Sequence, residues 1–364
     1  MESLNFMNME ALTKWIGSKG KYLEEILPLI PRDVKRYYEP FVGGGSMFLA
    51  MPEVERYIIG QPCKELMTMY REAQQAEPDF MGHLRNFNAA WKNIAKQCQK
   101  HSAELRKLYA DFPEGKNYDY LEYVHTLNPL LEQISYDAVF PANYGQKVLF
   151  EMEKRHHFTT RKTQSIGHKL KTPEALDKFI LTSQKAAVYE YLMELFNLGG
   201  MNRALKSAVL LFLLEFSSNG QYALDEDGEF RPSYGGSLQN DRSLDRAINL
   251  IEGQEFRARM DKTEFHALEM GSLFMKIRPQ KDDFLLVDPP IGRLERKVGA
   301  NTFSAGDMEV VLNLLEGCKG RWMLLVKKVD MSSRLSVMLL DHYSQPLGPE
   351  KELFAIMNYD PEKQ

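Results

Sequence analysis

The chain has 364 residues, 44% hydrophobic and 26% charged, with a formal net charge of −4, so its composition excludes a disordered protein and a global basic field for nucleic acid. Three widely separated cysteines, Cys63, Cys98 and Cys318, exclude a disulfide framework or a zinc cluster by their spacing and predict a reducing compartment. No run of apolar residues matches a membrane span or a signal peptide, so we expect a soluble, cytoplasmic protein.

The first 60 residues predict an alternation of helices and strands. Apolar residues recur at helical spacing in KYLEEILPLI (21–30). The segment VKRYYEPFVGGGS (34–46) is typical of a strand that leads into a glycine turn. A helix is predicted to begin with SMFLAM (46–51). A second strand is predicted at VERYIIG (54–60).

The middle of the chain has a different pattern. Long amphipathic stretches without clear strands predict helices at 64–75, 104–112 and 203–216. The segment that follows, residues 217–236, contains Asn-Gly and Asp-Gly pairs, which are turn signals of β-hairpins.

The last hundred residues return to an α/β pattern, with apolar strands at 284–287, 321–328 and 352–359 and a helix at 308–317. We therefore predict a doubly wound α/β sheet domain made from both ends of the chain, with a mostly helical domain inserted into it. The expected boundaries are residues 1–64 and 203–364 for the sheet domain and residues 65–202 for the insert.

The segment FLLVDPPIG (284–292) carries the clearest chemical signal. Its buried strand delivers Asp288 to the carboxyl end of a strand, where ligands bind in open α/β sheets. Pro289 and Pro290 have fixed φ angles and no N–H, so their carbonyls are free to accept hydrogen bonds. This arrangement suits the holding of an exocyclic amine during transfer of a group to its nitrogen. Ile291 stands where an aromatic side chain would stack on a base.

Two glycine-containing segments near the N-terminus admit more than one interpretation. EPFVGGGS (39–46) follows a strand and precedes a helix, without the pattern of a Rossmann dinucleotide loop or a Walker loop. It is either a tight turn or a loop that lets the backbone approach a cofactor lacking phosphates. KWIGSKGKYL (14–23) is either a surface loop or an arm that places Trp15 against an adenine ring.

Taken together and in this order, four motifs resemble the Dam-like family of DNA adenine-N6 methyltransferases. KWIGSK (14–19) is similar to the family's KWxGGK, and EPFVGGGS matches its S-adenosylmethionine loop. FSSNGQYALDEDGEFRPSYG (216–235) resembles the family's F-N-G-x-x-R…GEFNVPFG hairpin, and VDPPIG stands in place of its DPPY. NTFSAGDMEVVLNLL (301–315) also resembles the stretch that follows the catalytic loop, whereas the similarity is poor between about 65 and 200.

The resemblance implies a Rossmann-like sheet that binds S-adenosylmethionine, an inserted target-recognition domain, and a target adenine flipped out of duplex DNA. It implies catalysis by positioning and electrostatics, without a metal. The catalytic residues that it implies are Asp288, Pro289, Pro290 and Ile291. The cofactor-binding residues that it implies are Trp15, Lys19, Glu39, Phe41, Gly43, Gly45, Gln61, Glu269 and Asp288.

Three of these residues depart from the family pattern. Ile291 replaces an aromatic, and base stacking on an aromatic contributes about 1–3 kcal/mol in single-strand binders. Gln61 replaces an Asp that binds the ribose hydroxyls, and a neutral amide forms weaker hydrogen bonds than a carboxylate. Glu269, in ALEMG (267–271), replaces an Asp that precedes a Phe facing the cofactor adenine. Either the pocket has adapted to another substrate, or catalysis has been lost while the fold persists.

Contacts with DNA are predicted in two segments. Residues 154–171 concentrate basic side chains without an acid, among them Arg155, Arg161 and Lys162, which suits phosphate neutralisation; the alternative is a solvated basic loop. The candidates in the hairpin are Asn219, Gln221, Tyr222 and Arg231. Carboxylates crowd the hairpin tip and repel phosphates, so the tip alternatively faces solvent or a partner.

Three functional hypotheses follow. The first is an S-adenosylmethionine-dependent DNA adenine-N6 methyltransferase associated with the nucleoid. The second is a catalytically degenerate relative that serves as a DNA-binding or partner-docking subunit in a defence or modification system. The third is a methyltransferase that acts on RNA or another amine, which the Asp-Pro-Pro chemistry alone does not exclude.

Overall fold

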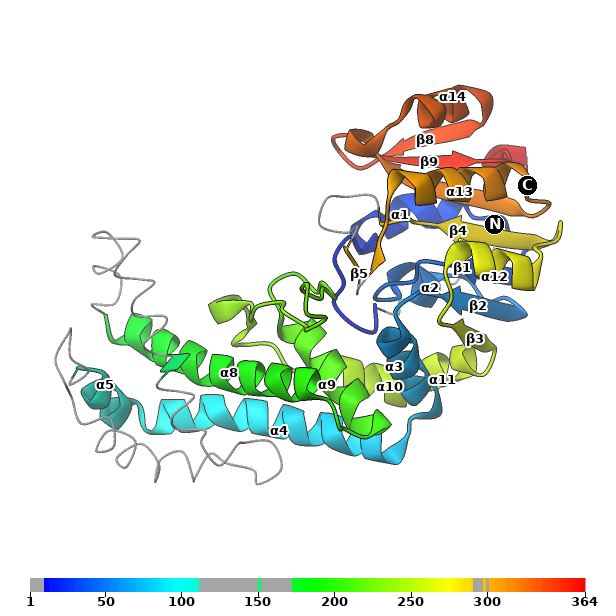
Figure 1. The fold of residues 1–364 in the computed structure, drawn as a ribbon. Helices are drawn as coiled ribbons and strands as arrows, with labels where there is room; N and C mark the ends of the chain where they lie inside the picture. The colour runs from blue at the N-terminus through cyan, green and yellow to red at the C-terminus, as the bar shows by residue number, and fades with distance from the viewer. Residues whose placement is uncertain (1–9, 111–149, 152–171, 291–296, 299–300, 364) are drawn as a thin grey trace. The chain divides into compact units, whose positions relative to one another are not determined.

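The structure, a computed structural model, describes residues 10–110, 150–151, 172–290, 297–298 and 301–363. The chain forms two compact units (Figure 1). Unit 1 comprises residues 1–77, 219–231 and 249–364, and unit 2 comprises residues 78–218 and 232–248. Among the described residues, no helix has both the length and the apolar character needed to cross a bilayer.

Unit 1 contains the sheet. Its strands are β1 (Arg36–Glu39), β2 (Arg56–Gly60), β3 (Thr263–His266), β4 (Asp283–Val287), β7 (Arg321–Lys327), β8 (Tyr343–Leu347) and β9 (Leu353–Met357). A separate two-stranded pair consists of β5 (Lys297–Val298) and β6 (Asn301–Thr302). Its α-helices are α1 (Leu23–Ile26), α2 (Ser46–Ala50), α3 (Lys64–Gln75), α11 (Gln254–Met260), α12 (Met270–Ile277), α13 (Ala305–Glu316) and α14 (Ser333–Asp341). Its short 3-10 helices are η1 (Gly20–Tyr22), η2 (Leu27–Leu29), η5 (Lys328–Asp330) and η6 (Pro361–Lys363).

The sheet has seven strands in the order β3-β2-β1-β4-β7-β9-β8. The pairs β1–β2, β2–β3, β1–β4 and β4–β7 are parallel, whereas β9 pairs antiparallel with both β7 and β8. The chain runs outward from β1 through β2 to β3 and then returns to place β4 on the other side of β1. The reversal of strand order between β1 and β4 confirms the expected doubly wound, Rossmann-like fold.

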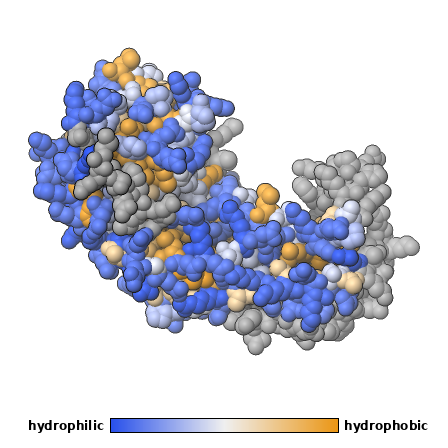
Figure 2. Space-filling view, turned by 180° about the vertical axis from the view of Figure 1, so that it is seen from behind, coloured by the Kyte–Doolittle hydropathy of each residue, from blue (hydrophilic) through white to orange (hydrophobic). Residues whose placement is uncertain are grey.

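Both faces of the sheet are covered, as the apolar strands predict. On one face, alternate strand residues such as Tyr38, Leu285 and Leu324 form a core with α12, α13 and α14. On the other face, Tyr57 contacts the ring of Phe48 from α2, with ring centroids 5.6 Å apart. Figure 1 shows α12 and α13 lying across the sheet. Hydrophilic residues cover most of the surface seen in Figure 2, with smaller hydrophobic patches between them.

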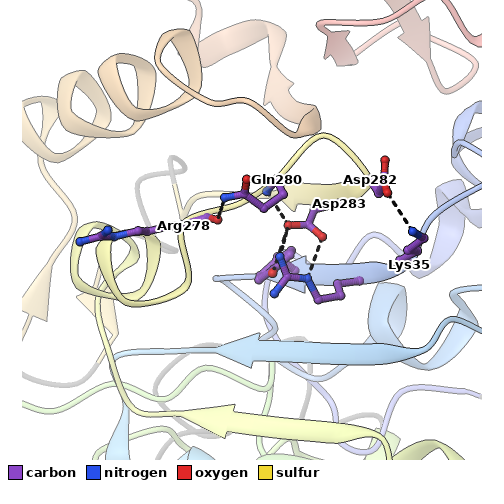
Figure 3. Close-up of polar contacts among 7 residues, drawn as sticks. Lys35, Arg278, Gln280, Asp282 and Asp283 are labelled. Atoms are coloured by element: carbon purple, nitrogen blue, oxygen red, sulfur yellow. Dashed lines mark hydrogen bonds and ion pairs between the residues drawn. The ribbon is translucent and has the colours of Figure 1, made fainter.

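A partly buried ion pair joins the first residues of β1 and β4. Arg36 donates from Nε and Nη2 to the two carboxylate oxygens of Asp283, at 2.8 and 2.7 Å. Asp283 is 1% exposed and also accepts from the Tyr38 hydroxyl at 3.3 Å and from the Gln280 backbone N–H at 2.6 Å (Figure 3). The pair coincides with the register Arg36↔Asp283. It therefore sets which residues of β1 and β4 lie together at the opposite, carboxyl ends of the two strands.

Unit 2 is helical. Its helices are α4 (Pro78–Lys100), α5 (Ser102–Ala110), α8 (Pro173–Leu198), α9 (Arg203–Phe216) and η4 (Gly236–Gln239), and α10 (Asp245–Glu252) begins in it. Trp91 of α4 packs against Phe212 and Phe216 of α9, with ring centroids 5.2 and 4.3 Å apart. Lys185 of α8 is also buried, 4.4 Å from the Trp91 ring, and donates to the Asn240 carbonyl at 2.5 Å. Burial lowers the pKa of Lys185 to about 8.

The two units differ from the expected domain boundaries at both ends of the insert. Helix α3 belongs to the sheet unit, because Tyr70 stacks on Phe265 and Gln74 donates to the carbonyls of Met260 and Thr263. Helix α9 belongs to the helical unit, because its apolar side chains pack on α4 and α8. The insert as a compact body therefore starts at residue 78 and includes α9.

Most of the predicted elements are confirmed, including the strands around 54–60, 284–287, 321–328 and 352–359 and the helices at 64–75 and 203–216. Two edge-region strands, β3 and β8, were not predicted. β3 spans only four residues, and β8 contains Pro346, so neither shows the apolar run of a central strand.

We expect Asp283→Ala to lower the free energy of unfolding by about 2–4 kcal/mol, because it leaves a partly buried guanidinium and a backbone N–H without their acceptor. Unfolding in urea measures the effect. Asp282→Ala is the matched control, since Asp282 pairs with Lys35 at the surface, where both side chains are more than half exposed (Figure 3). The control should shift the unfolding midpoint little, and equal losses in the two variants would contradict the role given to Asp283.

Candidate functional site

A cavity lies at the carboxyl ends of β1, β2 and β4, where the strand order of unit 1 reverses. It encloses about 530 Å³ of space, part of it open to solvent. Residues predicted from the sequence as catalytic and as cofactor-binding line this same cavity: Trp15, Lys19, Glu39, Phe41, Gly43, Gln61, Asp288, Pro289 and Pro290. Ligands of doubly wound sheets bind at this position.

Asp288, one residue beyond β4, is held by an ion pair with Lys19. The Lys19 Nζ lies 2.7 Å from one carboxylate oxygen of Asp288 and 2.8 Å from the other. The Lys19 side chain is 5% exposed and the Asp288 side chain 18%. Lys19 also donates to the Gly17 carbonyl at 2.8 Å. Asp288 is therefore paired with a cation on the cavity wall, and its role as the acceptor of an exocyclic amine stays a prediction.

Glu39, the last residue of β1, is the second carboxyl group on the cavity wall. It is 2% exposed, and the Tyr37 hydroxyl donates to its Oε2 at 2.7 Å. Burial raises the pKa of Glu39 well above its ordinary value; the Tyr37 hydrogen bond opposes this rise, and the negative charge of Asp288 adds to it. The neutral form of Glu39 is thus favoured beside an ionised Asp288.

The three glycines after β1 are required by close packing. A Cβ on Gly43, whose φ is +51°, would lie 2.6 Å from Cδ1 of Trp15. A Cβ on Gly44 would lie 2.3 Å from the Thr13 carbonyl oxygen, and one on Gly45 would lie 2.7 Å from the Tyr70 hydroxyl. The loop therefore lies directly against the 13–15 segment, and its glycines hold Trp15 at the cavity.

Gln61 follows β2 and is one of the residues that line the cavity. Its side chain is buried, with the residue 4% exposed, and its Oε1 has no hydrogen-bond partner among the described residues. A buried acceptor without a partner costs about 1–3 kcal/mol. A ligand hydroxyl that donates to Oε1 would remove this cost, so the residue that departs from the family pattern still suits a hydroxylated ligand.

Two predicted cofactor residues are not among those that line the cavity. Glu269 is exposed and precedes α12, without a side-chain hydrogen bond to the helix N-terminus. Gly45 is buried against Tyr70 on the side of the glycine loop that faces α3. The cofactor-binding roles of Glu269 and Gly45 stay predictions from the sequence resemblance.

The hairpin residues differ in their accessibility. Tyr222 is 3% exposed and packs on Phe230, with ring centroids 5.5 Å apart, while its hydroxyl bonds to Cys63 and Glu65. Burial raises the pKa of Tyr222. The structure thus places Tyr222 in the interior of unit 1, where it stabilises the hairpin instead of presenting its hydroxyl at the surface.

The other hairpin candidates lie closer to the surface. Asn219 and Gln221 are half-buried, and Asn219 accepts from the Gln221 backbone N–H at 3.1 Å. Arg231 is exposed but forms ion pairs with Asp225, at 2.5 Å, and with Glu229. Its positive charge is therefore matched by the carboxylates of the hairpin tip.

Gly220 connects the hairpin to the cavity. Its carbonyl accepts from the Ile16 backbone N–H at 3.2 Å, and its φ is +69°. A Cβ there would lie 2.7 Å from the Lys14 carbonyl and from the Trp15 nitrogen. The hairpin thus rests on the same short segment that positions Trp15.

Ile291 and the basic residues Arg155, Arg161 and Lys162 lie outside the described residues. Ser46 and Met47, which also line the cavity, were not singled out from the sequence. The feature of the sequence that could have identified them is their position directly after the glycine loop. Within the part of the chain that the structure describes, no group of three or more His, Cys, Asp or Glu side chains could hold a metal ion.

We expect Gly220→Ala to weaken binding of S-adenosylmethionine, the cofactor that the sequence resemblance implies, because the added Cβ pushes the 14–16 segment and Trp15 away from the cavity. Isothermal titration calorimetry measures the affinity for S-adenosylmethionine. Gly228→Ala is the control: Gly228 also has a positive φ, +80°, but a Cβ there meets nothing within 4 Å. An affinity loss of the same size in both variants would show that backbone strain alone is responsible.

Glu39 should make stability depend on pH. Because its pKa is raised in the folded state, the stability it contributes is present below its unfolded pKa, near 4.5, and is lost as the pH rises toward the folded value. We expect Glu39→Gln to remove this pH dependence. For one proton, it changes the free energy of unfolding by at most about 1.4 kcal/mol per pH unit. Chemical unfolding of both proteins from pH 4 to 8 gives the two slopes. Parallel slopes would mean that Glu39 is ionised in the folded protein.

Comparison with known proteins identifies the family. A family model described as D12 class N6 adenine-specific DNA methyltransferase matches residues 15–293, more than half of the chain. The chain is also similar to the type II methyltransferase M1.LlaDCHI of Lactococcus lactis subsp. cremoris, with 30% identity over 82 residues, which cover 22% of this chain and 28% of that protein.

Two further relatives have slightly lower identity over somewhat longer stretches. The type II methyltransferase M.MjaIII of Methanocaldococcus jannaschii is 26% identical over 119 residues, which cover 30% of this chain and 40% of that protein. The DNA adenine methylase of Escherichia coli K12 is 27% identical over 111 residues, which cover 30% of this chain and 39% of that protein. The chain thus spans less than half the length of these relatives. Together with the sheet order, the glycine loop and Asp288 on one cavity, the family match shows that the chain belongs to the D12 class of N6 adenine-specific DNA methyltransferases.

Proposed function

We propose that the protein transfers a methyl group from S-adenosylmethionine to N6 of an adenine flipped out of duplex DNA. The observation that supports this most directly is the Asp288 carboxylate, which binds the Lys19 ammonium on the wall of the cavity at the carboxyl end of β4. An adenine N6 amine also presents N–H donors, and it carries no charge.

The residues of the cavity suit the cofactor that the family implies. The buried Gln61 Oε1 needs a donor, which a ribose hydroxyl supplies. Trp15 and Phe41 offer aromatic surface on the same wall. The neutral form of Glu39 accommodates polar groups without adding a second negative charge beside Asp288. When bound, S-adenosylmethionine supplies an activated methyl group on a positively charged sulfur.

Asp288 and the Pro289 carbonyl would accept hydrogen bonds from the target amine. These acceptors attract the N–H protons and so increase the electron density on the nitrogen, which makes its lone pair more available for attack, and catalysis is electrostatic and positional. The nitrogen would form a bond to the methyl carbon while the bond from that carbon to the cofactor sulfur breaks, so that the sulfur leaves as a neutral thioether. The methylated nitrogen would then release one proton to solvent, to which the Asp288 side chain is 18% exposed. No general base is needed before the attack, because the exocyclic amine attacks with its own lone pair.

Lys19 has a defined part in this scheme. It occupies both oxygens of Asp288, so an incoming amine must displace it or share the carboxylate with it. Lys19 thereby holds the Asp288 carboxylate in a fixed orientation before substrate binds. Extrusion of a base from a duplex costs a few kcal/mol, and this cost must be offset by contacts in the cavity.

We expect Asp288→Ala to reduce the rate of methyl transfer by about 10²–10³-fold or more, because it removes the charged acceptor of the amine. Transfer of tritiated methyl groups to mixed-sequence duplex DNA measures the rate, and calorimetry with S-adenosylmethionine shows whether cofactor binding persists. Asp282→Ala, at the other end of β4 and exposed, is the control and should retain wild-type activity.

Two outcomes would contradict the proposal. Undiminished transfer by Asp288→Ala would remove Asp288 from the mechanism. A wild-type protein that is folded and binds both S-adenosylmethionine and DNA, yet incorporates no label, would favour the degenerate DNA-binding subunit. Transfer to RNA in preference to DNA would keep the chemistry and change the substrate.

A further inference from the structure

One wall of the cavity is formed by a segment without regular structure. Residues 15–19, the wall segment, all line the cavity, and none of the five belongs to a helix or a strand. The regular backbone bonds of a helix or sheet therefore do not hold this wall, and its shape depends on contacts at its two ends. Just before it, the Leu12 N–H donates to the carbonyl of Gly44 in the glycine loop at 2.9 Å.

The other end of the wall segment is closed by Tyr22. The Tyr22 backbone N–H donates to the Lys19 carbonyl at 2.8 Å, next to the turn of η1. Tyr22 is 6% exposed, and its hydroxyl donates to Oε1 of Glu352 at 2.7 Å. Tyr22 thus connects the lysine that pairs with Asp288 to a carboxylate near the other end of the chain.

Glu352 lies at the same edge of the sheet as Asp288. It immediately precedes β9, and the first residue of β9, Leu353, pairs with the last residue of β7. Because β9 runs antiparallel to β7, while β7 runs parallel to β4, the start of β9 lies at the edge where the parallel strands end. Asp288 and Glu352 therefore hold the wall segment and the turn that follows it from one edge of the sheet.

The Tyr22 hydroxyl is the main contact of Glu352 with the N-terminal segment. It is the largest of the effects that lower the pKa of Glu352 to about 2, so the carboxylate is ionised at neutral pH. Lys21 also pairs with Glu352, with its Nζ 3.2 Å from Oε1. The Lys21 side chain is 67% exposed, and an ion pair so exposed to water contributes little.

The turn between β8 and β9 is shaped to present Glu352. A Cβ on Gly348, whose φ is +82°, would lie 2.6 Å from Oε2 of Glu352. Lys351, directly before Glu352, has a φ of +51°, which is uncommon for a residue with a side chain. The Gly348 N–H also donates to both carboxylate oxygens of Glu25 in α1, at 2.9 and 3.1 Å. A strained backbone persists where the surrounding contacts fix it, and here those contacts join the turn to the helices that follow the wall segment.

We propose that Tyr22 and Glu352 are positioning residues, whose contact anchors the wall segment, and with it Lys19, in the conformation that binds the cofactor. All of these residues belong to unit 1. The inference rests on the proposed function, in which S-adenosylmethionine occupies this cavity. Without the anchor the wall segment samples other conformations, and the observed affinity falls with the fraction of molecules that keep the competent one.

The test compares Tyr22→Phe with Tyr359→Phe in the full chain. Each variant removes one hydroxyl that joins the N-terminal segment to the end of the chain, since the Tyr359 hydroxyl donates to the Leu29 carbonyl at 3.0 Å. Leu29 belongs to η2, which α1 separates from the wall segment, so Tyr359→Phe is the matched control. Urea unfolding should show a similar loss of stability in both variants.

Only Tyr22→Phe should affect the wall segment and the cofactor. We expect faster hydrogen exchange in a peptide that covers residues 15–22, measured by mass spectrometry. We also expect the affinity for S-adenosylmethionine, measured by calorimetry, to fall by about three- to tenfold, the range that corresponds to one hydrogen bond. In methyl-transfer assays, KM for S-adenosylmethionine should rise while kcat stays near the wild-type value, because the bound cofactor restores the wall segment.

Glu352→Ala tests whether the Tyr22 hydroxyl acts through the carboxylate. We expect Tyr22→Phe/Glu352→Ala to bind S-adenosylmethionine no more weakly than Glu352→Ala alone, because the two changes break one contact. Losses of affinity that multiply in the double variant would show that the two residues act separately, and the proposal would fail.

The remaining outcomes separate the anchor from the proposed function. Unchanged exchange in Tyr22→Phe overturns the anchor. Faster exchange with wild-type affinity for S-adenosylmethionine overturns its role in cofactor binding, as does an equal loss of affinity in Tyr22→Phe and Tyr359→Phe. If the wild type binds no S-adenosylmethionine, the proposed function fails, and exchange still decides about the anchor: faster exchange in Tyr22→Phe alone supports it, and equal exchange in the two variants overturns it.

Discussion

The parallel pairing of β1 with β4 is the constraint on which the site depends. The strand order of the sheet reverses between these two strands, and the partly buried Arg36–Asp283 pair marks their register at the amino end. Because both strands run in the same direction, this register brings Glu39 and Asp288 to one cavity at the carboxyl end. A shift of one residue would turn alternate side chains to the opposite face of the sheet.

Two carboxyl groups lie in one cavity, and two negative charges there would repel each other. Two features of the structure reduce this repulsion. Lys19 neutralises Asp288 directly, with its Nζ on both carboxylate oxygens. Burial raises the pKa of Glu39, so this group avoids a second negative charge by keeping its proton. The result is a single ionised acceptor with a nearby cation, which is suited to binding an amine. The same arrangement explains why Lys19, at the far end of the sequence from Asp288, is nearly fully buried.

The helical unit shows a different balance of charge. Its interior buries Lys185 against Trp91, whereas one face of α4 exposes cations beside amides. The basic segment 154–171, predicted from the sequence as a DNA contact, lies outside the described residues. Within the described residues, Tyr222 of the hairpin is interior and Arg231 is paired with acids.

The sequence by itself determined the doubly wound sheet, the central strands and the residues of the cavity, because buried strands leave long apolar runs and the four motifs occur in an ordered series. It also indicated Asp288 as an amine acceptor, from the strand end and the two prolines. Only the tertiary structure decided that Lys19 pairs with Asp288, that Tyr222 is interior, and that α3 packs in the sheet unit and α9 in the helical unit. Each of these depends on contacts between residues far apart in the chain, which periodicity and spacing along the sequence do not record.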